Sequence, residues 1–240
     1  MIRKFLILLG LLTCTAVAQE KFQTTLITYA LGGPPGGFKA FFRNGEEIQP
    51  FGANGSGLGA PIRYTGSRKF EIRASEEAFA PPPAGQQAPP PLAVVELPQG
   101  VDNILLIAAD AGQGKIRLLA YDVSAKALKG GDYKIFNFCR TPIEMNLGKK
   151  KLTLRPAQNE IMSDSSYQDP TNRGMELIIY RYDGTVRNPT PVKQTLWEHF
   201  STKRWVMFLF DPKHKGEGIG IICMNVEPPR AAPAAAGTAP

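Results

Sequence analysis

The sequence predicts an all-β protein that contains two tandem immunoglobulin-like β-sandwich domains. Three observations lead to this prediction. Apolar runs have the length of strands, glycine and proline turns separate them, and helix signals are almost absent. In addition, two stretches of the chain resemble each other at a spacing of about a hundred residues, which is the size of one sandwich domain.

The clearest strand is WVMFLF at residues 205–210. Six consecutive apolar residues are too many for a strand with one face in water and too few for a stable helix. The stretch NILLIAAD at 103–110 has the same pattern, and each run is closed by an aspartate, Asp110 or Asp211. We therefore expect two equivalent central strands, each buried on both faces.

The hairpins that follow these runs support an internal duplication. When Ile104 is aligned with Trp205 and the later turn is given two extra residues, Val123 falls on Val226. The two aspartates then occupy equivalent strand ends, where we expect them to accept backbone N–H bonds in the turn.

A second similarity lies upstream. GGFKAFF at 36–42 resembles GGDYKIFNF at 130–138, with Lys39 aligned to Lys134. Two similarities in the same order predict two copies of one unit. The alternative is that apolar strands followed by glycine turns look alike in any all-β protein.

The first eighteen residues have the pattern of a secretory signal peptide. MIRK is positively charged, FLILLGLL is apolar but short for a bilayer span, and the Ala-Val-Ala at 16–18 forms a small-residue cleavage site. Lipoprotein anchoring through Cys14 is an alternative, although Thr13 fits that signal poorly. Because no second long apolar run follows, we expect an exported protein, periplasmic or extracellular, without a transmembrane segment in the mature chain.

Two segments have compositions that exclude them from a sheet. AFAPPPAGQQAPPP at 78–91 is a proline-rich insert and should form an exposed loop, because proline cannot join a sheet ladder. The tail EPPRAAPAAAGTAP has no apolar pattern and is predicted to be disordered. The predicted organisation is a signal peptide at 1–18, domain 1 at 19–124, domain 2 at 125–226 and the tail at 227–240.

Within the first domain, residues 22–75 contain several short strands. Asn44-Gly45 between two apolar runs is the strongest hairpin signal in the chain. Thr65-Gly66, inside PIRYTGSRKFEIRA, predicts a second hairpin turn. In the second domain, KKLTLRPAQNEI alternates so that Leu152 and Leu154 should face inward.

The positive charge is concentrated in the second half. Residues 19–124 carry 9 basic and 10 acidic side chains, whereas residues 125–240 carry 17 and 11. The densest cluster is a candidate anion-binding patch for an anionic polysaccharide, lipid headgroups or an envelope protein, or simply a solvated hairpin rim. Export and the absence of interleaved aromatic residues argue against nucleic acid. The patch consists of Lys149, Lys150, Lys151 and Arg155.

Cys139 and Cys223 are the two cysteines that remain after the signal peptide. An even pair in an oxidising compartment is a candidate disulfide, and the alternative is two small buried hydrophobes. Cys223 follows Ile219 and Ile221 in alternation, which places its thiol on the apolar face of the strand. The chain has no CxxC pair, so redox catalysis has no support.

No catalytic, metal or cofactor motif rises above background, and we expect no cofactor. His199 and His214 are the only histidines, and the pair Asp211 and His214 lacks a third metal ligand. The serines at 163–166 have neither a nucleophile elbow nor a nearby histidine. The sequence therefore favours a non-enzymatic binding or structural protein of the bacterial cell envelope.

Two other classes stay open. A hydrolase or carbohydrate-active enzyme would show a cleft with two carboxylates about 5–10 Å apart. A polysaccharide-binding module would show exposed aromatic residues in a row on one sheet face, for which Tyr167, Tyr182 and Trp197 are the candidates.

Overall fold

The computed structural model describes residues 22–34, 36–163, 174–211 and 218–226. Within these ranges the chain is all-β, and its only helical element is the 3-10 turn η1 (Glu77–Phe79). The predicted signal peptide at 1–18, with Cys14, and the predicted tail at 227–240 lie outside the described residues. No helix in the described part of the chain is long and apolar enough to cross a membrane.

The first half of the chain forms two sheets, which we call the inner and the outer sheet. The inner sheet has the order β4-β1-β7-β8, with β1 and β7 parallel. The outer sheet consists of the hairpins β2-β3 and β5-β6, which are joined by a backbone bridge between Phe41 and Arg73. The strands are β1 (Phe22–Leu31), β2 (Phe38–Asn44), β3 (Glu47–Ala53), β4 (Ile62–Gly66), β5 (Lys69–Ile72), β6 (Ala93–Glu96), β7 (Asn103–Asp110) and β8 (Ile116–Asp122).

The second half has the same arrangement. Its inner sheet has the order β12-β9-β16-β17, with β9 and β16 parallel, and its outer sheet has the order β11-β10-β13-β15. The strand β14 extends β13 as a short hairpin. The strands are β9 (Tyr133–Asn137), β10 (Ile143–Leu147), β11 (Lys150–Leu154), β12 (Asn159–Met162), β13 (Gly174–Asp183), β14 (Val186–Arg187), β15 (Lys193–Glu198), β16 (Trp205–Phe210) and β17 (Gly220–Asn225).

The registers of the two long hairpins agree with the alignment made from the sequence. Ile104 pairs with Asp122 in the first half, and Trp205 pairs with Asn225 in the second. The other similarity is wrong. The stretch at 130–138 forms β9, which runs parallel to β16 as β1 runs parallel to β7, whereas the stretch at 36–42 lies mainly in β2 of an outer sheet.

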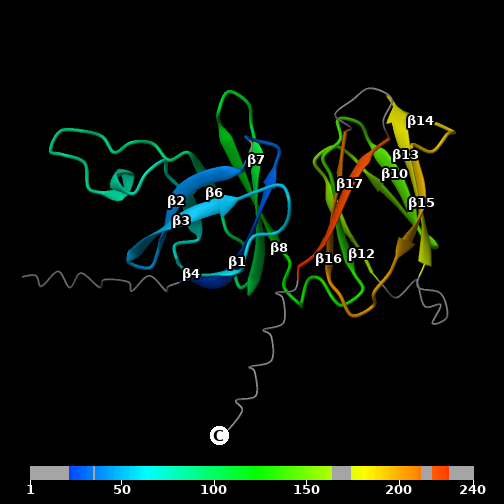
Figure 1. The fold of residues 1–240 in the computed structure, drawn as a ribbon, viewed down its shortest axis with the longest axis horizontal. Helices are drawn as coiled ribbons and strands as arrows, with labels where there is room; N and C mark the ends of the chain where they lie inside the picture. Colours follow the sequence, from blue (N-terminus) through cyan, green and yellow to red (C-terminus); the bar gives the residue numbers. More distant parts are fainter. Residues whose placement is uncertain (1–21, 35, 164–173, 212–217, 227–240) are drawn as a thin grey trace, which may run out of the picture.

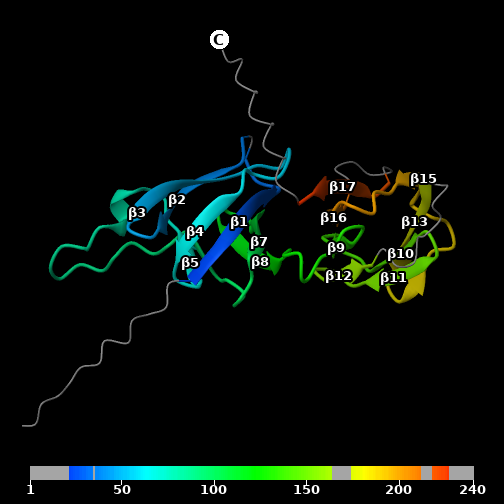
Figure 2. The ribbon, with the colours of Figure 1, turned by 90° about the horizontal axis from the view of Figure 1, so that it is seen from below.

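The two inner sheets pack face to face, so the molecule has four sheet layers, as Figures 1 and 2 show. Along β7, Ile104, Leu106 and Ala108 face the core of the first half, and Leu105 and Ile107 face the second half. The strand β16 alternates in the same way between its own core and the interface. The prediction of central strands buried on both faces is confirmed, and the layering explains it, because each inner sheet is covered on both sides.

Aromatic rings fill the interface between the inner sheets. The ring of Tyr29 on β1 stacks on Phe208 of β16, with centroids 4.6 Å apart and planes 4° from parallel. Phe136 adds a tilted contact to Phe208 at 5.1 Å and an edge contact to Tyr121 at 4.8 Å. We call this layer the inter-sheet interface.

The two turn predictions have different outcomes. Asn44-Gly45 lies at a tight hairpin in which Asn44 pairs with Glu47, and Gly45 adopts φ +62°, which a side chain disfavours. Thr65-Gly66 does not join a hairpin. The strand β4 pairs with β1 of the inner sheet and β5 with β6 of the outer sheet, so the chain crosses between layers here. Gly66 and Ser67 are residue types that occur both in hairpin turns and in connections between two sheets.

Candidate functional site

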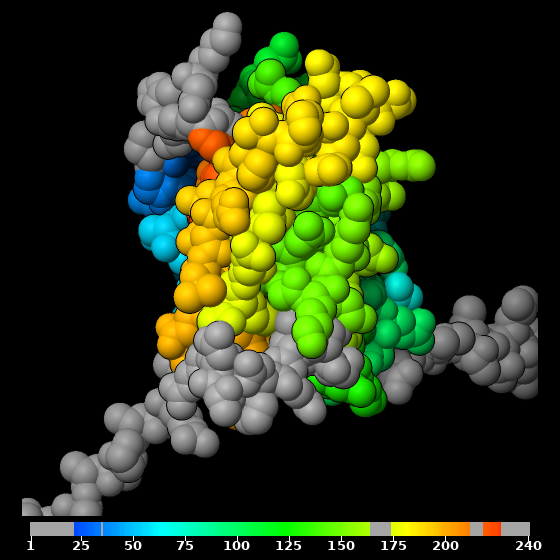
Figure 3. Space-filling model, turned by 90° about the vertical axis from the view of Figure 1, so that its right-hand side faces the viewer, coloured from blue at the N-terminus to red at the C-terminus, as the bar shows by residue number. Residues whose placement is uncertain are grey.

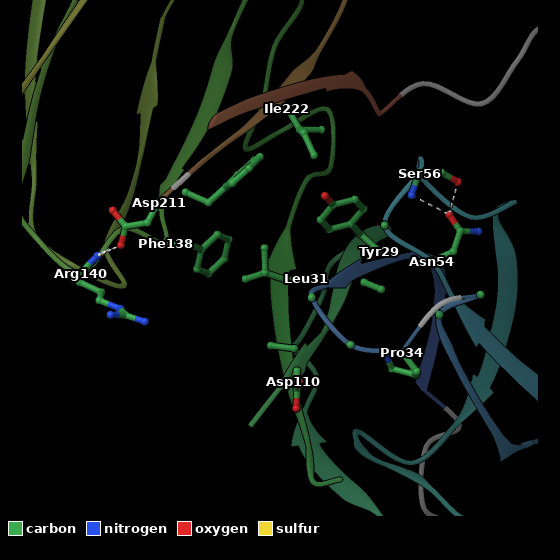
Figure 4. A pocket seen from close by; sticks show the side chains of 18 residues that line it. Tyr29, Leu31, Pro34, Asn54, Ser56, Asp110, Phe138, Arg140, Asp211 and Ile222 are labelled. Carbon is green, nitrogen blue, oxygen red and sulfur yellow. Dashed lines mark hydrogen bonds between the residues drawn. The ribbon is translucent and has the colours of Figure 1, made fainter. Parts of the chain in front are cut away.

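A cleft of about 950 Å³ opens between the two halves, at the edge of the inter-sheet interface (Figure 4). The ends of β1, β7 and β16 converge there. One wall comes from the first half, through residues 32–34, 36–37 and 54–56. The other wall comes from residues around β9, β16 and β17 of the second half, so neither half forms the cleft alone.

The first wall is built mainly of backbone. Gly37 adopts φ +81°, and a Cβ at this position would overlap the carbonyl of Ala53, so only glycine lets the loop lie against the end of β3. Asn54 holds the adjacent turn, because its Oδ1 accepts hydrogen bonds from the backbone N–H of Ser56 at 3.1 Å and from its hydroxyl at 2.8 Å. This wall is therefore preformed.

The floor of the cleft is aromatic and apolar. Tyr29, Phe138 and Phe210 contribute rings, and Leu31 and Ile222 contribute aliphatic side chains. Burial raises the pKa of Tyr29, so its phenol stays neutral and can act as a hydrogen-bond donor or acceptor. The ring of Phe210 lies over Gly220, where an added Cβ would overlap it. A glycine in β17 thus leaves room for this ring.

The two equivalent aspartates lie on opposite walls of the cleft, and both have structural partners. Asp110 accepts the backbone N–H of Gly112 at 2.8 Å, which is the turn role expected from the sequence. Asp211 accepts the backbone N–H of Arg140 at 2.9 Å, in a neighbouring loop of the second half. Its other oxygen lies 3.0 Å from Nη2 of Arg181, so the charge of Asp211 is neutralised.

Arg140 supplies a cation at the mouth of the cleft. Its backbone is fixed by Asp211, while its side chain is exposed and lines the cleft opposite the first half. No acidic residue in the described ranges forms an ion pair with Arg140. Among the described residues, the cleft thus combines an apolar floor with the polar side chains of Asn54 and Ser56 and the guanidinium of Arg140 at its rim, which is the usual composition of a binding pocket.

The predicted basic patch lies elsewhere, on and beside β11 of the second outer sheet, whose solvent face is seen in Figure 3. Lys151 is not free, because its Nζ lies 2.8 Å from Glu144, a carboxylate whose side chain is only 6% exposed. Arg187 also approaches Glu144, at 3.6 Å. Lys149 and Lys150, which we call the exposed lysine pair, have no ion-pair partner among the described residues.

Cys139 and Cys223 both pack into the core of the second half, and we call them the core thiols. They are free in the structure, and burial raises the pKa of each to about 12. The expected apolar placement of Cys223 is confirmed. The bridge between the core thiols stays a candidate from the sequence, and a thiol count distinguishes it from two small buried hydrophobes.

The aromatic row expected of a polysaccharide-binding module is not formed by its described candidates. Trp197 pairs with Met175 and packs toward the core, whereas Tyr182 lies on the outer face, where its hydroxyl is 3.5 Å from Glu144. Tyr167 and His214 lie outside the described residues. His199, the other histidine, contacts the hydroxyl of Tyr133 at 3.1 Å. In the described ranges no group of three or more His, Cys, Asp or Glu side chains could hold a metal ion.

The sequence had not suggested the cleft residues Tyr29, Asn54, Ser56 and Arg140 as site residues. The one signal that could have led to the cleft was the pair of aspartates, because equivalent strand ends in two packed units lie near their common boundary. No family model matches this chain, and no curated protein matches it either.

Proposed function

We propose that the chain is an exported, non-enzymatic binding protein of the bacterial cell envelope, and that its ligand is held in the cleft between two duplicated immunoglobulin-like sandwiches. The observation that carries the proposal is that both halves of the chain contribute residues to the cleft. A preformed backbone wall from the first half faces Arg140 of the second half across an apolar, aromatic floor to which both halves contribute. Binding sites occur preferentially at such domain boundaries.

Duplication is supported by topology and register. Both inner sheets place the first strand between an antiparallel and a parallel neighbour, and both long hairpins share one register. Equivalent positions of the two halves also belong to the inter-sheet interface, namely Leu105 and Val206, and Val123 and Val226. We infer that an ancestral sandwich used this one face for association.

Export is supported by the sequence of the first eighteen residues. A binding role is favoured over catalysis because the two carboxylates at the cleft are engaged. Asp110 accepts a backbone N–H in its turn, and Asp211 is paired with Arg181. An acid and base pair would need at least one carboxyl group free to exchange protons with a substrate.

The test uses muropeptides, which combine sugar and peptide chemistry, as probes of the purified mature protein. A ligand that binds only the folded state at 100 times its Kd stabilises that state by about 2.7 kcal/mol, which is visible as a rise in Tm. We expect at least one muropeptide to raise the Tm of the wild type. Sugar-only and peptide-only fragments then identify which part is bound.

The matched variants separate the cleft from the rest of the surface. Ser56→Trp places a large ring at the cleft wall, and Thr185→Trp places the same ring at an exposed turn of the second half. The proposal predicts that Ser56→Trp abolishes the rise in Tm and that Thr185→Trp retains it. Equal shifts in both variants, or no shift with any probe, would contradict the cleft as the binding site.

A further inference from the structure

The proline-rich insert is far longer than the connection it makes. The strands β5 and β6 are antiparallel neighbours in which Ile72 pairs with Ala93, and the N–H of Leu92 continues the ladder to the carbonyl of Ile72 at 2.8 Å. Strands in this position need a loop of about 2–5 residues. Residues 74–91 leave the sheet after the Phe41–Arg73 bridge and return to pair beside Ile72, so the insert does not connect two domains.

The insert has an internal architecture of its own. Prolines at 81–83 and at 89–91 form two arms around a turn. In this turn the N–H of Gln86 donates to the carbonyl of Pro83 at 3.0 Å, and Gly85 takes φ +83°, as the third residue of a type II turn requires. Ala80, at the start of the first arm, has φ −67° and ψ 149°, which is polyproline II geometry.

A single guanidinium clamps the base of both arms. Nη1 of Arg73 donates to the carbonyl of Ala78 at 2.6 Å on one arm and to that of Pro89 at 3.2 Å on the other. Glu71 accepts from Nε of Arg73 at 2.8 Å, so the clamp is charge-balanced. Arg43 and Arg73 also lie over the ring of Phe79, at 5.7 and 5.1 Å from its centroid.

Beyond the clamp, residues 80–90 are all exposed, and the loop extends from the first outer sheet in Figure 1. At its base, Leu92 and Val94 expose 39% and 40% of their surface on one side of β6, next to the second proline arm. The two arms, Leu92 and Val94 carry no charged side chain. We call residues 79–92 the proline hairpin.

We propose that the proline hairpin is a docking element for a partner protein that binds polyproline II segments in an aromatic-lined groove. Polyproline II is recognised in this way because its prolines pack on aromatic rings and its carbonyls stay free to accept hydrogen bonds. The clamp fixes the base of the arms, the type II turn fixes their tip and proline restricts φ along them, which lowers the entropic cost of association. Anionic surfaces are disfavoured as partners, because residues 78–92 carry no charge.

The experiment begins in the cell that makes the protein. Benzoylphenylalanine is introduced at Gln87 in the proline hairpin or, as the control, at Thr185 in an exposed turn of the other half, and both full-length proteins are irradiated. A partner crosslinked from Gln87 and not from Thr185 is identified and purified. No such adduct would overturn the proposal.

An adduct counts only if the purified partner passes a binding test. The proposal predicts that Pro81→Ala, Pro82→Ala and Pro83→Ala together weaken binding at least 10-fold at unchanged Tm. Arg73→Lys, which keeps the charge but removes the fork, should weaken binding severalfold and speed proteolysis within the hairpin, whereas the exposed control Arg63→Lys should do neither. Unchanged affinity of the triple alanine variant would overturn the proposal.

Discussion

Replacing Phe208 by alanine tests whether the two sandwiches are joined in solution by the inter-sheet interface. Phe208 is fully buried, stacks on Tyr29 at 4.6 Å and contacts Phe136 at 5.1 Å, so its removal leaves a cavity between the halves. Deleting a buried phenylalanine side chain costs about 3–5 kcal/mol. Roughly 0.5–1.5 kcal/mol of that loss should belong to the stacked pair alone.

The assay is urea unfolding followed by two probes. The chain has two tryptophans, Trp197 and Trp205, and both lie in the second half, so their fluorescence reports that half while circular dichroism reports both. In the wild type we expect coincident transitions. Phe208→Ala should lower the free energy of unfolding by about 3–5 kcal/mol and separate the two transitions, because the halves lose their main contact.

A double-mutant cycle supplies the control. Tyr29→Ala combined with Phe208→Ala should show a coupling energy of roughly 0.5–1.5 kcal/mol. Met207→Ala removes the next side chain of β16, which points into the core of the second half. Its coupling to Tyr29→Ala should be within about 0.5 kcal/mol of zero. A loss below about 1 kcal/mol for Phe208→Ala, with no coupling to Tyr29, would refute the packed interface.

Three further predictions follow from the charges and thiols. Burial lowers the pKa of Lys134, so the unfolded state keeps this proton to a higher pH than the folded state does, and the free energy of unfolding should rise as the pH approaches 10.5. Lys134→Met should remove this rise. The same dependence of the free energy of unfolding on pH in the variant and the wild type would contradict the prediction. Substituting the exposed lysine pair by glutamine should leave Tm unchanged and reduce retention on anionic polysaccharide in low salt, while Lys151→Gln should cost about 1 kcal/mol because it weakens the pairing of buried Glu144. The core thiols should react with a thiol reagent only slowly in the native protein and number two after denaturation without reductant, and a count of zero would establish their bridge.

The inner strands could be predicted from the sequence because a strand that is buried on both faces has apolar residues at consecutive positions. The runs at 103–110 and 205–210 are continuous rather than alternating, since one set of side chains fills a sandwich core and the other fills the inter-sheet interface. The outer strand β11 was predictable for the opposite reason. Leu152 and Leu154 alternate with polar residues because its other face meets water.

The passage of the chain from the inner sheet (β4) to the outer sheet (β5) could not be predicted from the sequence. A turn reports that the chain reverses, and the same residues suit a reversal within a sheet or a passage to the next layer. The similarity of 36–42 and 130–138 failed for a related reason. Both stretches are apolar strands after glycine turns, but β2 and β9 occupy different sheets, and only the pairing partners distinguish them.

The cleft and the clamp were beyond sequence reasoning because their parts are distant in the chain. Arg140 faces residues of the first half that are more than eighty positions upstream, and no local pattern relates them. In the sequence, the residues that flank Arg73 give no sign that it has a structural role. Its role becomes visible only when the carbonyls of Ala78 and Pro89 are seen to meet at its guanidinium.

The cleft and the inter-sheet interface are physically continuous, which links binding to the docking of the two halves. Tyr29 forms part of the cleft floor and also stacks on Phe208, and Ile222 belongs to both regions. A ligand that contacts Tyr29 therefore binds the docked arrangement better than a separated one, and stabilises it in proportion to that difference in affinity. Phe208→Ala should accordingly weaken ligand binding without touching the cleft walls, whereas Ser56→Trp should block binding while leaving the two unfolding transitions coincident.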